Sequence, residues 1–495
     1  MALKSTPPHI YKDDVDILAC KILVWESGDK TKIDVKDPPD DKCLTIRECE
    51  SIEIVESTKK PIGTATVKFP RGTIIKRTLT KNDLEENGAT EVYTERLADG
   101  AIIEQHSGTS VAKPSDFKVG QRIRIYLTYY HDKSRKAINK WDAEHISTEE
   151  IDKAFLNHPD FDGYITKCSV STPIEIKCEN LLSALKRKNC RKITTGNHTT
   201  IQELLKEGGK YDLLKGTGIQ LDKDTLNAKT DIGKMQLCDS LTVADVLTEW
   251  SKYGVYTYLV YDDEGHPYLS ANTPFNEKAL KAEMEKPTWA LIQFDYHVAN
   301  DGLTLMNTDP KFLAVSATGY KFEGTGKNQK EIKYSITVRL NPEWTGTSDT
   351  KHKKFQLLNE TQLSKKSMKL GAVPKSCVKD KVDLSQYQVV PYISRKIGIT
   401  EDELIKEAEM YFENYHMNGI EGSITIFGDR HQTDRGISHI APGMKVELLD
   451  ERVPEKNGWY RVEEVQTTFG TGGFRQTLKL PYCYARPEKT KEEKK

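Results

Sequence analysis

Short apolar runs with a period of two dominate the N-terminal part of the chain. Residues 51–55 (SIEIV), 63–69 (GTATVKF) and 121–128 (QRIRIYLT) carry β-branched or aromatic side chains at alternate positions. Successive side chains of a strand point to opposite faces, so this alternation is typical of strands that bury one face. We therefore expect β-sheet here, with further strands at 15–25, 161–168 and 173–178.

Helical spacing replaces this alternation after residue 190. Thr199 and Gln202 have the spacing of a capping box. In this motif the side chain of each of the two residues hydrogen-bonds the backbone amide of the other at the start of a helix. Thr242 precedes a second helix, whose apolar positions up to Trp250 share one stripe. Together with two strand patterns that a turn sequence separates, these signals predict an α+β module; the strands are at 255–261 and 267–270.

The C-terminal part combines one strong helix signal with more strands. Thr400 and Glu403 form a capping-box pattern, and residues 401–416 place apolar side chains along one stripe. The glycine-rich sequence 470–473 is typical of a hairpin loop. Strands are expected on both sides of the helix, at 291–298, 312–322, 331–340, 422–427, 444–449, 459–466 and 474–480.

Composition excludes some classes of protein. The chain has 495 residues, enough for about three domains. Its 73 basic and 74 acidic residues give a net charge of -1, which argues against a nucleic-acid coat or a membrane-surface protein, since both need a basic excess. No apolar stretch approaches a membrane span, and the nine cysteines contain no CxxC pair. We expect a protein of a reducing cytoplasm, with buried free thiols.

No catalytic, cofactor or metal-binding residue is nominated. A phosphate-binding loop fails because Asn328 follows Gly326 and Lys327, and no GxSxG elbow is present. Two groups of possible metal ligands match no known spacing, and we interpret both as solvated surface. No pair of carboxylates stands out for glycoside hydrolysis. The two groups are Asp142, Glu144 and His145, and His431, Asp434 and His439.

The C-terminal sequence resembles the last β-barrel of phage tail hub proteins. The pieces are a GSITIFG strand, an IAPGMKV turn and strand, an NGWYRVEEV strand, and the closing hairpin TTFGTGGFRQTLKL. This family includes baseplate hubs of contractile tails, late control protein D and the hub half of type VI spike proteins. Earlier segments resemble the family in the same order: 161–166 with 173–180 its first-barrel strands, and 241–269 its α+β insert.

The resemblance implies a mainly β fold with an α+β insert, in which each chain forms two small tube-like β-barrels and three chains form a ring. Combined with the strand pattern, it predicts five parts. These are a first β-barrel domain at 1–190 with a charged insertion at about 131–160; the α+β insert at 191–288; strands completing the first barrel plus a loop or linker region (345–370) at 289–398; a helix and the second barrel at 399–484; and a charged tail at 485–495.

The resemblance also implies partners. Six barrels in a homotrimer would cap the hexameric tail tube, or bind a distal tail protein, and would seat a threefold spike, fibre or tip protein. The channel would pass the tape-measure protein and then DNA, which is in transit only. The chain ends soon after the last barrel, so we expect the spike to be a separate protein. The location would be the virion tail tip or baseplate, assembled in the bacterial host cytoplasm without stable membrane insertion.

Other functions stay open at this point. A tail-associated cell-wall hydrolase is one alternative, which rests only on the many carboxylates and tyrosines, and a receptor-binding adhesin is another. The chain could also be the hub of a contractile injection system with a separate spike. The family pattern and the lack of a catalytic motif favour a structural protein that is not an enzyme and needs no cofactor.

Overall fold

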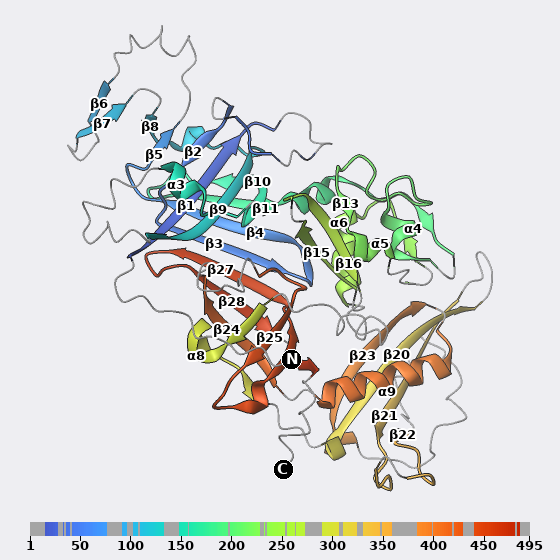
Figure 1. The fold of residues 1–495 in the computed structure, drawn as a ribbon. Helices are drawn as coiled ribbons and strands as arrows, with labels where there is room; N and C mark the ends of the chain where they lie inside the picture. Colours follow the sequence, from blue (N-terminus) through green and yellow to red (C-terminus); the bar gives the residue numbers. More distant parts are fainter. Residues whose placement is uncertain are drawn as a thin grey trace.

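The computed structural model shows a chain of several sheets with a few helices (Figure 1). No described helix is long and apolar enough to cross a membrane. The described residues are 15–27, 33, 36–39, 42–76, 92–96, 102–106, 109–132, 148–156, 158–196, 199–227, 232, 235–252, 255–262, 264–272, 290–305, 310–323, 330–346, 349–358, 384–397, 399–417, 420–428, 440–480 and 483–485.

A 14-stranded sheet, antiparallel at each of its described pairings, forms the centre of the molecule. It joins strands from the two ends of the chain. In spatial order the strands are β18 (Val298–Asp301), β24 (Ile420–Phe427), β28 (Arg475–Leu480), β27 (Glu464–Gly470), β3 (Ser51–Ser57), β4 (Lys60–Phe69), β11 (Ile174–Asn180), β10 (Phe161–Cys168), β9 (Arg122–Asp132), β1 (Val15–Trp25), β2 (Leu44–Ile46), β5 (Ile74–Lys76) and β8 (Thr109–Val111); β19 (Thr304–Leu305) pairs with β24.

The N-terminal strands of this sheet enclose one apolar core. Alternate residues of β4 are buried, among them Ala65, Val67 and Phe69, as the period of two predicts. They pack against Ile123 and Ile125 of β9 and against residues of β1, β2, β3, β5, β10 and β11. The six strands predicted between residues 15 and 178 are therefore confirmed. Shorter elements nearby are β6 (Val92–Arg96) and β7 (Ile102–His106), which pair with each other, a 3-10 helix (Pro114–Asp116) and α3 (Thr148–Asp152).

The α+β module contains the predicted hairpin and helices. Thr200 and Glu203 form the capping box of its first helix, so the expected pair Thr199 and Gln202 is wrong by one residue. Thr242 accepts a hydrogen bond from the Asp245 amide at the start of the next helix, as expected. The elements are a 3-10 helix (Leu181–Arg187), β12 (Ile193–Thr194), α4 (Ile201–Leu205), β13 (Gln220–Leu221), α5 (Lys223–Asn227), β14 (Gln236–Leu237), α6 (Val243–Lys252), β15 (Tyr256–Tyr261) and β16 (Pro267–Asn272).

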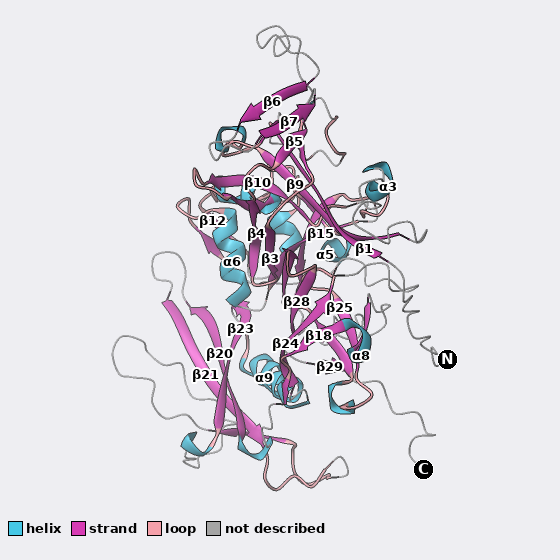
Figure 2. Cartoon of the chain, turned by 90° about the vertical axis from the view of Figure 1, so that its left-hand side faces the viewer, coloured by secondary structure: helices cyan, strands magenta, loops and turns pink. Residues whose placement is uncertain are grey.

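Residues 289–398 contribute to more than one sheet. Strands β18 and β19 of this region pair with β24 in the 14-stranded sheet, whereas four later strands form a separate sheet. The expectation that the region completes the first barrel stays a prediction. Helix α9 (Glu401–Met417) packs on this separate sheet through Leu404, Ala408 and Phe412 (Figure 2). The sheet has the order β22 (Phe355–Leu358), β21 (Lys330–Leu340), β20 (Leu313–Glu323) and β23 (Gln388–Ile397), with 3-10 helices at Pro310–Phe312 and Leu384–Gln386.

Two predictions fail locally in this part of the chain. Strand β22 lies inside the expected loop 345–370, where a strand of four residues is too short to show a period. The expected strand 291–298 is split by α8 (Phe294–His297) into β17 (Ala290–Gln293) and β18. The helix expected at 401–416 is confirmed.

The C-terminal strands form a second core between two sheets. Strands β24, β27 and β28 face a sheet of four strands across a cluster that includes Ile424, Val446, Tyr460 and Leu478. The expected strand 459–466 is in fact two strands, since the chain turns at Val462 and Glu463. The second sheet has the order β17, β25 (Lys445–Leu449), β26 (Gly458–Arg461) and β29 (Cys483–Ala485), with a 3-10 helix at Pro454–Lys456.

Candidate functional site

The residue groups considered for metal or phosphate chemistry lie outside the described residues. This applies to Asp142, Glu144 and His145, to His431, Asp434 and His439, and to Gly326, Lys327 and Asn328. Within the described ranges, no three His, Cys, Asp or Glu side chains are placed to hold a metal ion. The features that distinguish this fold are instead the contacts that join its parts.

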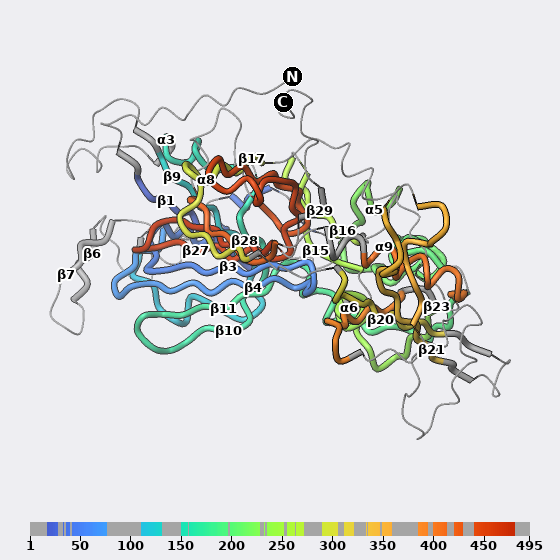
Figure 3. Tube along the Cα trace, turned by 90° about the horizontal axis from the view of Figure 1, so that it is seen from below, coloured from blue at the N-terminus to red at the C-terminus, as the bar shows by residue number. Residues whose placement is uncertain are grey.

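The first of these contacts is a seam between the two ends of the chain. Strand β27 pairs with β3 over seven residues, from Glu464 opposite Ser57 to Gly470 opposite Ser51. The C-terminal hairpin therefore continues the sheet that begins in the N-terminal part, as the adjacent red and blue tubes show (Figure 3). The Gln466 side-chain amide donates to the Glu53 carboxylate across this seam at 2.6 Å.

Aromatic side chains of the C-terminal hairpin enter the N-terminal core. Phe469 and Phe474 belong to the same buried cluster as the strands β1 to β11, and their ring centroids lie 5.9 Å apart. The Phe474 amide donates to the Tyr129 hydroxyl of β9 at 2.9 Å. Gly470 permits this approach, because a Cβ at its position would lie 2.4 Å from the Glu50 carbonyl oxygen. The seam thus joins a shared core as well as two strands.

A buried carboxylate lies at the end of the seam. Glu463 has a side chain 7% exposed, and its two oxygens contact Lys59 Nζ at 2.6 Å and Lys479 Nζ at 3.0 Å. The hydrogen bond to Glu463 raises the pKa of the Lys479 ammonium group. The Glu463 carbonyl also accepts from the Thr58 amide at 2.8 Å. This residue therefore links the β3–β4 turn to both C-terminal strands.

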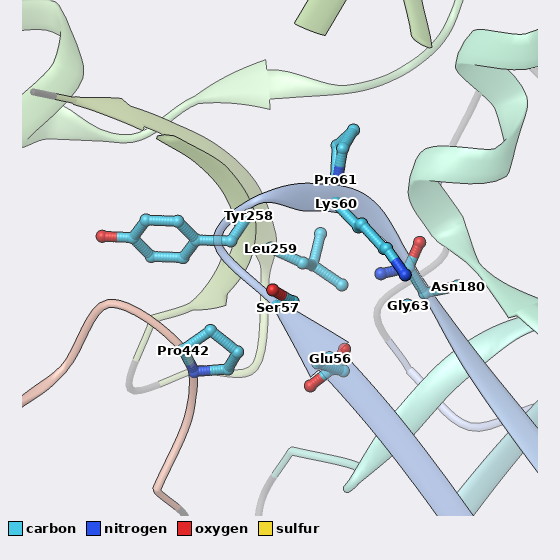
Figure 4. A pocket seen from close by; sticks show the side chains of 9 residues that line it. All are labelled: Glu56, Ser57, Lys60, Pro61, Gly63, Asn180, Tyr258, Leu259 and Pro442. Carbon is cyan, nitrogen blue, oxygen red and sulfur yellow. The ribbon is translucent and has the colours of Figure 1, made fainter. Parts of the chain in front are cut away.

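A junction between three parts of the chain lies beside that turn (Figure 4). Strand β15 of the α+β module reaches it, where the Thr257 amide donates to the Thr58 carbonyl at 3.2 Å. The next residue, Tyr258, accepts a hydrogen bond from Arg461 Nη2 at 3.2 Å. The Pro442–Gly443 turn of the C-terminal part closes the other side. The crevice between these three segments is narrow, and the residues that line it hold the three parts of the chain together.

Replacing Gly443 by alanine is expected to lower the free energy of unfolding by roughly 2–4 kcal/mol, the combined cost of a left-handed alanine and of overpacking. Gly443 has a φ of +84°, and a Cβ there would lie 2.1 Å from Cζ of Tyr258. Urea unfolding followed by tryptophan fluorescence measures this loss.

Gly120 provides the matched control for this substitution. It has a φ of +93°, but nothing lies within 4 Å of the position that a Cβ would take, so Gly120→Ala should incur the backbone cost alone. Adding Tyr258→Ala to Gly443→Ala should recover part of the loss, since the clash is with the Tyr258 ring. Equal losses for Gly443→Ala and Gly120→Ala would contradict a close contact between Gly443 and Tyr258.

A cluster of buried charges covers the outer face of β9 and β10. Arg122 binds both oxygens of Asp162, at 2.9 and 2.8 Å, and Arg124 Nε donates to Asp162 Oδ2 at 2.9 Å. Both guanidinium groups also lie over the Trp25 ring, 5.3 and 5.4 Å from its centroid. Burial works to lower the pKa of Arg124, but the attraction of Asp162 outweighs it and the pKa lies above its ordinary value.

The same cluster fixes a segment between β1 and β2. Asp37 accepts hydrogen bonds from Arg124 Nη1 at 3.0 Å and from the Tyr126 hydroxyl at 2.7 Å. Burial tends to raise the pKa of Asp37, and these two hydrogen bonds together with Lys21 bring it below its usual value. Sequence reasoning missed this cluster, because Arg122 and Arg124 alternate like ordinary outward side chains of a strand.

The central sheet presents one polar face that crosses the seam without interruption. Side chains that face away from the two cores are exposed or half-buried on each of seven consecutive strands, from β11 to β18. Two rows of side chains, related by strand register, run across this face, and Val55 and Phe427 are their apolar members. One row is Lys177, Thr66, Glu53, Thr468, Arg475 and Phe427, and the other is Glu179, Thr64, Val55, Gln466, Thr477, Thr425 and Asn300.

Solved structures similar to this chain include two bacterial tail proteins. The 43 kDa tail protein of prophage MuSo2 from Shewanella oneidensis is 11% identical, with 93% of this chain and 97% of that chain covered and a TM-score of 0.43. The tail protein from Neisseria meningitidis MC58 is 10% identical, with 94% and 96% covered and a TM-score of 0.45.

A chain of the Francisella PdpA-VgrG complex, half-lidded, is also similar, at 11% identity, with 98% of this chain and 61% of that chain covered and a TM-score of 0.43. No family model and no curated protein matches the sequence. Because the three TM-scores lie below 0.5, the function proposed below rests on this chain's own strand pairing.

Proposed function

We propose that this chain is the structural hub of a bacteriophage tail tip or baseplate, and that it acts without catalysis. Three copies would form a ring that joins the hexameric tail tube to a threefold spike, fibre or tip protein. The observation that carries the proposal is the seam between β3 and β27, which makes one continuous sheet from the two ends of each chain. A chain with two such sheet segments contributes two of the six positions around the ring.

The polar face of that sheet suits the wall of a channel. Its charged side chains mix both signs, with Lys177 and Arg475 in the same row as Glu53. Binding to DNA grows with the number of phosphates that basic side chains neutralise, so a mixed wall would hold passing DNA only weakly. An apolar wall would instead bind the unfolded tape-measure protein. We therefore assign this face to the channel.

The proposal predicts a trimer whose polar face is shielded. Light scattering of the purified chain should give three times the chain mass, and electron microscopy should show a ring with an open centre. A stable monomer at micromolar concentration that binds neither the tube nor the tip protein of its own genome would refute the hub function.

Labelling of introduced cysteines, located by peptide mapping so that the native thiols are scored separately, tests the assignment of the channel face. In a Cys238→Ser background, which removes an exposed thiol, Thr64→Cys lies on the polar face and Glu264→Cys on the β15–β16 hairpin, with its side chain 82% exposed. A small maleimide should label both positions in the ring, whereas a maleimide on a large polymer should label Glu264→Cys alone. Equal polymer labelling at both positions in a confirmed trimer would place the polar face outside the channel.

A further inference from the structure

Two thiols lie in contact where β1 passes the segment that connects β2 to β3. Cys20 of β1 is 4% exposed, and Cys49 is half-buried against the same core. Their sulfur atoms are 3.8 Å apart. A disulfide has a sulfur separation of about 2.05 Å, so closure needs a relative movement of roughly 2 Å, which small changes of the two side-chain torsions can supply.

The sulfur atoms of two other described cysteines contact oxygen atoms. The sulfur of Cys43 contacts the Thr45 hydroxyl at 3.8 Å, and that of Cys168 contacts the Pro114 carbonyl at 3.7 Å. Cys20 also donates to the Arg47 carbonyl at 3.3 Å, which holds its sulfur beside the segment that carries Cys49. The seven cysteines whose side chains the structure describes are free thiols.

We propose that Cys20 and Cys49 are a disulfide-forming pair, reduced while the chain folds and oxidised once it meets a disulfide oxidant. With oxidised glutathione, the Cys49 thiolate attacks one glutathione sulfur, forms a mixed disulfide and releases one glutathione thiolate. The Cys20 sulfur then loses its proton to water, attacks Sγ of Cys49 and releases the second glutathione. The two cysteines lose two electrons and two protons, and one oxidised glutathione becomes two reduced molecules.

Cys49 is the first nucleophile in this sequence for two reasons. Its side chain is half-buried and accessible to a small oxidant, whereas Cys20 lies inside the core. The hydrogen bond to Cys49 and burial raise the pKa of the Cys20 thiol well above its ordinary value, so Cys20 carries little thiolate. Nucleophilic attack needs the thiolate form.

The bond would close a loop that carries part of the buried charge cluster. The segment between the two cysteines includes β2 and Asp37, which binds Arg124 and Tyr126. A crosslink across about 30 residues removes freedom from the unfolded chain and so favours the folded state. If the chain is a hub in a particle that leaves the reducing host cell, the disulfide would stabilise it after release. This benefit rests on the proposed function, whereas the formation of the disulfide does not.

Peptide mapping of the full chain tests the pair directly. The reduced protein is divided between oxidised glutathione and dithiothreitol, free thiols are alkylated, and the chain is digested with trypsin without reduction. Cys20 and Cys49 then lie on separate peptides with one cysteine each, residues 13–21 and 48–59. The oxidised sample should contain these two peptides joined, with the mass of two hydrogen atoms lost, and its thermal midpoint should rise by roughly 5 °C.

Matched variants separate the pair from other thiols. Cys49→Ser should abolish both the linked peptide and the rise in midpoint, and Cys43→Ser, which lies on the separate tryptic peptide 43–47, should keep both. Recovery of both peptides alkylated after oxidation would overturn the proposal, as would a linked peptide without a rise in midpoint. The two cysteines lie in one chain, so the test of the disulfide does not depend on whether the chain is a trimer. Absence of the linked peptide refutes the disulfide in either state. A monomer that contains the linked peptide would count against the proposed ring and not against the disulfide.

Discussion

Replacing Asp162 by asparagine is expected to lower the free energy of unfolding by roughly 3–5 kcal/mol, because two buried cations would lose their shared carboxylate. Arg122 and Arg124 are each 1% exposed, and the Asp162 side chain is 2% exposed. Asparagine preserves the size of the side chain, so the loss reports charge and hydrogen bonding rather than a cavity. Urea unfolding at neutral pH measures it.

Asp37 provides the control within the same cluster. Its side chain is 33% exposed, so water compensates part of the lost charge, and Asp37→Asn should cost only about 1 kcal/mol. If Asp162→Asn cost no more than Asp37→Asn, burial of the Arg122–Asp162 pair would not determine the stability of this region. In the double variant Asp37→Asn/Asp162→Asn, the two losses of free energy should not simply add. Additive losses would contradict a single coupled cluster.

Much of the secondary structure was predictable because its signals are local. In β4, Ala65, Val67 and Phe69 are buried at alternate positions, and Ile52 and Ile54 alternate in the same way at the start of β3. Helix α9 begins after Thr400, which bonds Glu403 as the capping pattern predicts. A strand of ten residues or a helix of seventeen contains enough repeats for its period to be seen in the sequence alone.

Strand partners were not predictable in the same way. Any strand with a period of two can pair with any other, and β3 and β27 are separated by about 400 residues. For the same reason the sequence could not show that β20, β21, β22 and β23, within the part expected at 289–398, pair among themselves. The boundaries of the five predicted parts stay predictions beyond these strand pairs.

The joints between parts had weak sequence signals that are clear only in retrospect. Gly443 and Gly470 were expected at turns, but a glycine in a turn does not reveal which side chain approaches it. Tyr258 looked like an ordinary strand residue of the α+β module. Its role depends on Arg461, which is 203 residues away.

Replacing Phe474 by alanine is expected to cost roughly 3–5 kcal/mol and to loosen both ends of the chain together. Phe474 is fully buried, yet it lies on the C-terminal hairpin and packs in the core of the N-terminal strands. Its loss would leave a cavity beneath β3 and β9. Hydrogen exchange read by mass spectrometry should therefore show faster exchange in β3, β9 and β27.

Leu478→Ala is the matched variant for this experiment, since Leu478 is equally buried four residues further along but belongs to the C-terminal core. It should cost a similar free energy of unfolding while increasing exchange mainly in β17, β25 and β26. If Phe474→Ala loosened only those C-terminal strands, the hairpin would not be part of the N-terminal core. The seam would then be a contact between two independent units. The proposed hub function would lose the observation on which it mainly rests, the continuous sheet formed by the two ends of the chain.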